Sequence, residues 1–247
     1  MIILNEKAEA ERIIATGEFG DSVSDTLTLL ARYYYCKGNS AKEIYSELNK
    51  FLNENIPDYN PVLWKDMLNK KVKKAGKHPL TDVNNVVITK AEMEKIRSLK
   101  SLRLERLAFK LLCIAKFCNQ RNPNNNDWVC RQHKEIFKLA AIPATNMTQA
   151  LMLNELYEAG MIGLSKKVTN TNIRVLYIDE NSKVALAISD FRELGYEYMN
   201  YIGKNRYIRC AECGRLVPAK SNNKKYCKNC AAQVQAIQKA EWQKENK

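Results

Sequence analysis

Four cysteines near the C-terminus have the types and spacing of a metal site. Cys210 and Cys213 form one CxxC pair, Cys227 and Cys230 form a second, and 13 residues separate the pairs. Two thiolates at this spacing can bind one metal ion from a tight turn, and two such turns complete the tetrahedron of a structural zinc site. Because protein fills all four positions, we expect one structural Zn²⁺ ion. An iron–sulfur cluster is the alternative, whereas a redox CxxC motif would need a thioredoxin-like βαβ context that the sequence lacks.

The sequence around these cysteines resembles a treble-clef zinc finger over residues 208–247. Gly214 suits the turn of a zinc knuckle, residues 215–226 are expected to form a hairpin, and the second cysteine pair opens a helix. The resemblance implies that the knuckle and the first helical turn each supply two ligands. A zinc ribbon is the near alternative, in which the second pair would lie on another hairpin.

Basic and aromatic residues are interleaved around the cysteine pairs. Tyr201, Tyr207 and Tyr226 alternate with cations, and cations for phosphates with aromatics for base stacking suit a nucleic-acid surface. The alternative is that the tyrosines pack the small zinc core while the cations offset the thiolates. The predicted nucleic-acid contacts here are Arg215, Lys220, Lys224 and Lys225.

Residues 102–183 resemble a winged helix-turn-helix domain. An apolar stripe with helical spacing runs from Leu104 to Cys118, and Lys110 lies off that stripe. The other expected elements are a short helix over 131–140, a helix over 146–159, and strands over 161–168 and 173–179. The segment QALMLNELYEAGMIG is similar to the recognition-helix sequences of bacterial regulators and replication initiators.

This resemblance implies that the helix from Asn146 enters a DNA major groove. Asn146 and Gln149 would then pair with adenine, while Lys166, Lys167 and Arg174 would contact phosphates from the wing. The same helix carries Glu155 and Glu158 but no Lys or Arg. A module for packing or dimerisation is therefore the alternative.

Residues 1–80 are predicted to form a helical N-terminal region. Capping signals mark the starts of two of its helices: Ser40 precedes Glu43 by three residues, and Asn60 precedes Pro61. The segment KGNSAKEIYSELNKFLN resembles helical modules of phage and plasmid replication proteins. Four lysines near the end of the helix after Pro61 are predicted to contact nucleic acid, although a solvated helix end is the alternative: Lys70, Lys73, Lys74 and Lys77.

The remaining segments complete a multidomain, mainly α-helical organisation. Residues 81–101 form a linker and a short helix, which Thr89 and Glu92 cap, and residues 184–207 form a connecting segment. The chain is thus divided into the helical region at 1–80, the linker, the winged helix at 102–183, the connecting segment and the finger at 208–247.

Composition excludes several classes of protein. The 247 residues are 45% apolar, so the chain is not wholly disordered, and no apolar run is long enough to cross a membrane. The N-terminus lacks the pattern of a signal peptide, which predicts a cytoplasmic protein in a reducing compartment. Only two histidines occur, and no phosphate-binding loop or HExxH motif is present, so we expect no enzyme activity.

The net charge of +13 is concentrated in two regions. Residues 64–110 hold 13 basic and 5 acidic residues, and residues 201–247 hold 11 and 3, which leaves −3 for the rest. Phosphate contacts are therefore expected from these two regions more than from the winged helix. We predict a double-stranded DNA-binding protein of a phage or mobile element, either a regulator or a replication-associated factor. The alternatives are a non-catalytic protein that inhibits or redirects a host complex, and an RNA-binding protein.

Overall fold

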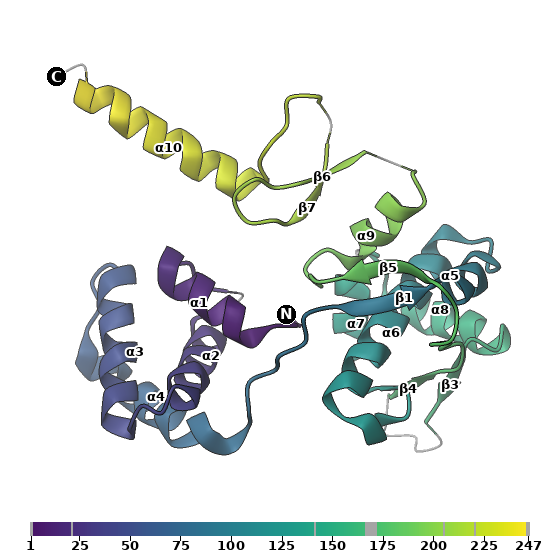
Figure 1. The fold of residues 1–247 in the computed structure, drawn as a ribbon, viewed down its shortest axis with the longest axis horizontal. Coiled ribbons are helices and arrows are strands. Elements are labelled where there is room, and N and C mark those ends of the chain that lie inside the picture. Colours follow the sequence, from purple (N-terminus) through teal and green to yellow (C-terminus); the bar gives the residue numbers. More distant parts are fainter. Residues whose placement is uncertain are drawn as a thin grey trace. The chain divides into compact units, whose positions relative to one another are not determined.

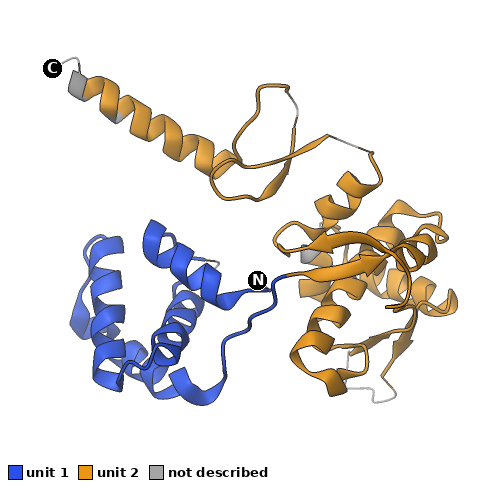
Figure 2. Ribbon diagram, viewed as in Figure 1, with its two compact units in different colours: residues 1–84 blue, residues 85–247 orange. Residues whose placement is uncertain are grey.

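The computed structural model describes residues 2–20, 22–140, 142–165, 172–204, 206–219 and 221–245. Most of these residues are helical, and the strands are short (Figure 1). The chain divides into two compact units, residues 1–84 and 85–247 (Figure 2). Each unit has its own core and is described separately.

Unit 1 is a bundle of four helices. They are α1 (Glu6–Thr16), α2 (Val23–Cys36), α3 (Ala41–Asn55) and α4 (Pro61–Lys74), and a short 3-10 turn over Ala75–Lys77 follows α4. Their apolar faces meet in a core whose fully buried members include Leu27, Leu30, Leu48, Leu52 and Leu68. Burial of these faces removes apolar surface from water and is the main driving force for the bundle.

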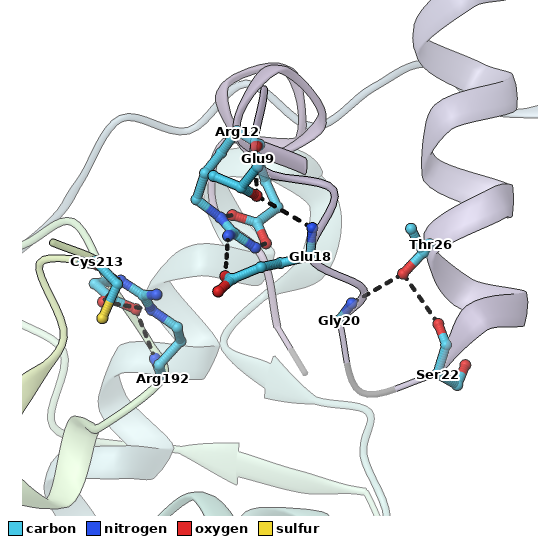
Figure 3. Close-up of polar contacts among 10 residues, drawn as sticks. Glu9, Arg12, Glu18, Gly20, Ser22, Thr26, Arg192 and Cys213 are labelled. Atoms are coloured by element: carbon cyan, nitrogen blue, oxygen red, sulfur yellow. Dashed lines mark hydrogen bonds and ion pairs between the residues drawn. The ribbon is translucent and has the colours of Figure 1, made fainter. Parts of the chain in front are cut away.

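Local side-chain bonds fix the ends of these helices. Ser40 and Glu43 form the predicted capping box, and the Asn60 side chain accepts a hydrogen bond from the backbone N–H of Val62. In α1 and the segment that follows it, Arg12 lies between Glu9 and Glu18, at 2.8 and 2.9 Å (Figure 3).

Unit 2 is built around α6 (Leu102–Arg121), whose residues from Leu107 to Phe117 are all buried. Three helices pack on α6: α5 (Lys90–Arg97), α7 (His133–Leu139) and α9 (Leu194–Tyr201). The helix α8 (Asn146–Glu158) contacts both α6 and α7. The last helix is α10 (Lys228–Glu245).

The described residues of unit 2 also form three small antiparallel sheets. The strands β1 (Val86–Thr89) and β5 (Val184–Ile188) form one pair, and β6 (Tyr207–Arg209) and β7 (Leu216–Pro218) form another. The third sheet has the order β2-β4-β3, from strands Trp128–Val129, Ile173–Val175 and Ile162–Leu164. A 3-10 turn over Pro123–Asn125 precedes β2.

A buried ion pair ties α5 to α6. Lys116 Nζ lies 2.8 Å from Glu92 Oε1, and both side chains are almost fully buried. The Glu92 carboxylate also accepts hydrogen bonds from the backbone N–H groups of Thr89 and Asp179. Glu92 therefore caps α5, as its spacing from Thr89 predicts, and also joins the segments before and after the central helices.

Several sequence expectations about the elements are confirmed, and others are wrong. The helices over 104–118, 131–140 and 146–159 are present as α6, α7 and α8. Within the described ranges, the two predicted strands are present only over Ile162–Leu164 and Ile173–Val175, where they pair as β3 and β4, and residues 176–179 are not strand. The hairpin expected within 215–226 is wrong, because Leu216–Pro218 pairs with Tyr207–Arg209, upstream of the first cysteine pair. Among the described residues, no helix is long and apolar enough to cross a membrane.

Candidate metal centre and basic surfaces

The four predicted cysteines come together in one cluster. Their sulfur atoms all lie within 4.8 Å of one another, and Cys213 Sγ lies 3.9 Å from Cys227 Sγ. A tetrahedral site with Zn–S bonds of about 2.3 Å would have sulfur atoms about 3.8 Å apart. A disulfide would need a separation of about 2.05 Å. The cluster therefore has the geometry of a site that could bind a metal ion.

The backbone folds each cysteine pair into position. Around the first pair, Cys210 N–H donates to Arg215 O and Gly214 N–H donates to Cys210 O, and Gly214 has a φ of +67°. Only glycine adopts this left-handed conformation without a steric cost, which explains the residue after the first pair. In the second pair, Cys227 directly precedes α10 and Cys230 lies in its first turn.

Hydrogen bonds favour the thiolate form of one cysteine in the cluster, Cys210. Burial raises the pKa of the Cys210 thiol, but backbone N–H groups of Cys213 and Cys227 outweigh it and lower the pKa to about 6. The pKa values of Cys213 and Cys230 are raised, chiefly because burial disfavours the thiolates. A bound cation would offset the charge of all four thiolates, since metal ligands must be deprotonated.

The cluster is also the centre of a very small core. Three of its cysteines are buried, and the apolar residues packed with them are Ile208, Val217 and Tyr226. Because so little apolar surface is available, a metal ion would supply most of the stability of this segment.

Polar contacts anchor the first knuckle to the region before and within α9. Arg192 Nη2 donates to the backbone carbonyl of Cys213 at 2.7 Å and also pairs with Asp190 (Figure 3). Arg209 Nη2 lies 2.9 Å from Glu197 Oε1, and Arg215 Nη1 lies 3.8 Å from Glu193 Oε1. The predicted phosphate ligand Arg215 is thus half-buried and lies close to a carboxylate.

The other predicted cations of this region differ in exposure. Lys225 is exposed, and so is Lys228 at the start of α10. Lys224 is half-buried and donates to Pro218 O at 2.8 Å. Lys220 lies outside the described residues. We call Lys224, Lys225 and Lys228 the finger surface.

The predicted lysines of unit 1 are all exposed. Lys70, Lys73 and Lys74 project from α4, and Lys77 ends the following 3-10 turn. Lys71 differs, because its Nζ donates to Ser24 and Thr28 on α2 at 2.7 and 2.8 Å. We call the four exposed lysines the α4 surface.

The predicted base contacts on α8 are placed differently from one another. Asn146 is exposed in the first turn. Gln149 is buried and its Nε2 donates to Ala144 O at 3.0 Å. A contact of Gln149 with a base stays a prediction, and it requires the amide to leave this bond.

The outward side chains of α8 are apolar and acidic. Met147 is 74% exposed and Leu151 53% exposed, and Glu155 and Glu158 are exposed beyond them. The apolar spacing of this helix predicts a core position for Leu151, and that prediction is wrong. Its position on the outer face follows from the packing of Met152, Leu153 and Leu156 inward.

The wing residues are described in part. Arg174 lies in β4, where its Nε donates to Asn126 O at 3.1 Å and its side chain is 46% exposed. Lys166 and Lys167 lie outside the described residues.

Sequence reasoning also missed the depth at which Lys110 lies. It is fully buried, and burial lowers its pKa to about 7.

Comparisons of the chain with protein-family models, with curated proteins and with solved structures find no match.

Proposed function

We propose that this chain is a non-catalytic, zinc-stabilised protein that binds double-stranded DNA through basic surfaces. The observation that carries the proposal is the finger surface. Exposed lysines lie directly beside and within the second cysteine pair, so the metal cluster would hold them in a fixed arrangement. The α4 surface supplies a second set of exposed cations. Cations of this kind bind phosphates without reading sequence.

Zinc is the metal that this donor set favours. Four cysteine sulfurs that all lie within 4.8 Å of one another suit Zn²⁺, and they would leave no position for a substrate, so the ion would be structural. An iron–sulfur cluster is the alternative for four thiolates. The start of α10 at the second cysteine pair supports a treble clef over a zinc ribbon.

The order of elements in unit 2 supports a winged-helix interpretation. Three helices, α6, α7 and α8, precede the antiparallel pair β3 and β4, and β2 adds a third strand. In such a domain α8 would be the recognition helix. Because its outer face carries Met147, Leu151 and two acids, we propose that phosphate contacts dominate and that the protein tolerates many DNA sequences.

The biological setting that we propose is a phage or mobile element. A winged helix and a zinc finger on one short chain would resemble the regulators and replication-associated factors of such elements.

Charge reversal on the finger surface tests the function. In Lys225→Glu/Lys228→Glu, both side chains are exposed, so the fold should persist. We expect at least about a tenfold loss of duplex affinity by fluorescence anisotropy, because two phosphate contacts are lost. The matched control is Lys42→Glu/Lys50→Glu on α3, which changes the net charge equally at two other exposed lysines. Equal losses in the two variants would contradict a specific finger surface.

A second candidate function is a protein that binds a host complex. The outer face of α8 favours it, since exposed apolar residues flanked by acids are typical of protein contacts. Capture of the same host protein from nuclease-treated lysate by the native chain, and its loss in Leu151→Asp, would favour this function over DNA binding.

RNA binding is the third candidate, favoured by the tyrosines near the finger. Tyr207 and Tyr226 are half-buried and Tyr201 is 40% exposed, so only Tyr201 offers much surface to a base. Competition between labelled duplex DNA and unlabelled RNA of the same length separates the two. RNA that displaces DNA at lower concentration than DNA itself would favour RNA.

A further inference from the structure

A pocket lies on the outer face of the β2-β4-β3 sheet, away from the cysteine cluster. Its volume is about 730 Å³, which falls within the range of about 300–1,000 Å³ of small-ligand sites. The described residues that line it come from the three strands, from their flanks and from the loop before β2. No acidic residue is among them.

The register of the sheet creates a flat platform inside this pocket. Trp128 and Gly163 both pair with Arg174, so the three residues form one row across the strands and face the same side. The opposite face carries the buried Val129, Ile173 and Val175. Gly163 adds no side chain to this row. A Cβ there would lie 3.8 Å from Arg174 Cβ, which is an ordinary van der Waals distance.

Asparagines form one rim of the platform, and hydrogen bonds hold that rim in place. Asn125 Nδ2 donates to Asn119 Oδ1 and to Trp128 O, both at 2.9 Å. Asn126 and Asp127 both have positive φ, a conformation that asparagine and aspartate adopt more readily than other non-glycine residues. The carbonyl of Asn126 then accepts from Arg174 Nε, which directs the guanidinium along the rim.

The rim keeps hydrogen-bonding capacity for a ligand. Among the described residues, the side-chain amide of Asn124 has no hydrogen-bond partner, and Asn124 is exposed. An amide offers both donors and an acceptor, which match the edge of a nucleobase. The half-buried indole of Trp128 offers a surface for stacking. Arg174 is exposed and pairs only loosely with Asp127, whose Oδ2 lies 3.9 Å from Arg174 Nη2, so its guanidinium can also face a phosphate.

We propose that this pocket binds one unpaired nucleotide of DNA, with its base stacked on Trp128 and its edge at the asparagine rim. The proposal rests on the proposed DNA-binding function and adds to it a preference for duplexes with an unpaired base or a single-stranded end. A paired base cannot enter the pocket, because its edge and its faces are already occupied within the duplex.

Cys130 provides a direct probe of the pocket. It is exposed and lines the pocket, whereas Cys36 is exposed in unit 1 and serves as the internal control. We expect saturating oligo-dT to slow alkylation of Cys130 in the zinc-loaded full chain by at least about fivefold, the effect of one stacked base. Alkylation of Cys36 should not change.

Two variants separate occupation of the pocket from binding nearby. Gly163→Val fills the platform and suits a strand, and the room beside Gly163 lets the fold persist. Asn124→Asp keeps the shape of the rim but places a negative charge in it. In both variants, protection of Cys130 should fall below about twofold while duplex affinity stays within about twofold of the native value. Gly20→Val is the matched control, because its Cβ would also have room, at 3.6 Å from Thr26 Oγ1.

The outcomes distinguish failure of this proposal from failure of the proposed function. Tight duplex binding without protection of Cys130, or equal protection in Gly163→Val, would overturn the pocket and leave DNA binding intact. Failure to bind either duplex or oligo-dT would overturn both. Protection by oligo-rU but not by oligo-dT would overturn the assignment to DNA.

Discussion

Lys110 shows how strongly tertiary packing can alter a single side chain. It lies on α6 with its Nζ 5.9 Å from the centre of the Phe191 ring, and among the described residues that atom has no hydrogen-bond partner. Burial lowers its pKa to about 7, although Cys113 and Glu193 act in the opposite direction. An unfolded lysine titrates near 10.4. Between these two pH values the unfolded chain binds the extra proton, so stability should rise with pH.

Lys110→Met should remove this pH dependence. The native chain should gain up to about 1.4 kcal/mol of unfolding free energy per pH unit from this lysine between pH 7 and 9, and the variant should lack that gain. The variant should also be more stable at pH 7, because it replaces a buried charge by an apolar side chain of similar size. Urea denaturation of zinc-loaded protein at both pH values measures the difference. Parallel pH profiles of the two proteins would show that Lys110 is not buried as described.

At the residue scale, local sequence patterns predicted the cysteine cluster. They did not predict features that depend on packing between distant segments. The ligand set Cys210, Cys213, Cys227 and Cys230 could be read from the sequence, because a chelate needs only short spacing within each pair. The burial of Gln149 and Lys110 could not be read, because it depends on what packs over them. The sequence gives Lys110 a position off the apolar stripe of α6, yet α9 and the segment before it cover that side.

At the element scale, we expect the finger to depend on a bound metal ion and α6 to be independent of it. The β6–β7 hairpin and the start of α10 share only a minimal apolar core, while α6 is buried along most of its length. Structural zinc contributes about 10–16 kcal/mol of apparent binding free energy in isolated fingers. The two elements should therefore respond very differently to a chelator.

Removal of the metal should unfold the finger selectively. We expect one equivalent of zinc per chain by elemental analysis, and rapid amide hydrogen exchange in residues 206–219 and 221–232 after chelation. Exchange in α6 should stay slow and serves as the control within the same molecule. Cys213→Ser should reproduce the effect without chelator. Absence of metal together with slow exchange in the finger would refute the metal centre.

The pairings between elements far apart in the sequence were the part of the fold that could not be predicted. The caps of α3 and α5 were predictable, because each capping box is complete within four residues. The pairing of Val86 with Ile188 was not, since it joins segments far apart in sequence. The hairpin predicted within residues 215–226 is wrong for a similar reason. Leu216–Pro218 could pair with a segment before it or after it, and the alternation of apolar and polar residues does not choose between them.

At the scale of the whole molecule, the positive charge is unevenly distributed. The two regions with a surplus of basic residues contain the α4 surface and the finger surface, and the rest of the chain is slightly acidic. The outer face of α8 follows the same trend, because it exposes acids rather than cations. Binding to DNA should therefore be dominated by phosphate contacts from these two surfaces and should depend strongly on salt.

The salt dependence of duplex binding by the zinc-loaded full chain tests this account most directly. Anisotropy titrations between about 50 and 200 mM salt give the slope of log affinity against log salt concentration, at about −0.9 for each phosphate contact. We predict a slope steeper than about −3, and a slope less steep by about 2 in Lys225→Glu/Lys228→Glu. A slope shallower than about −1, or no binding at low salt, would contradict the account.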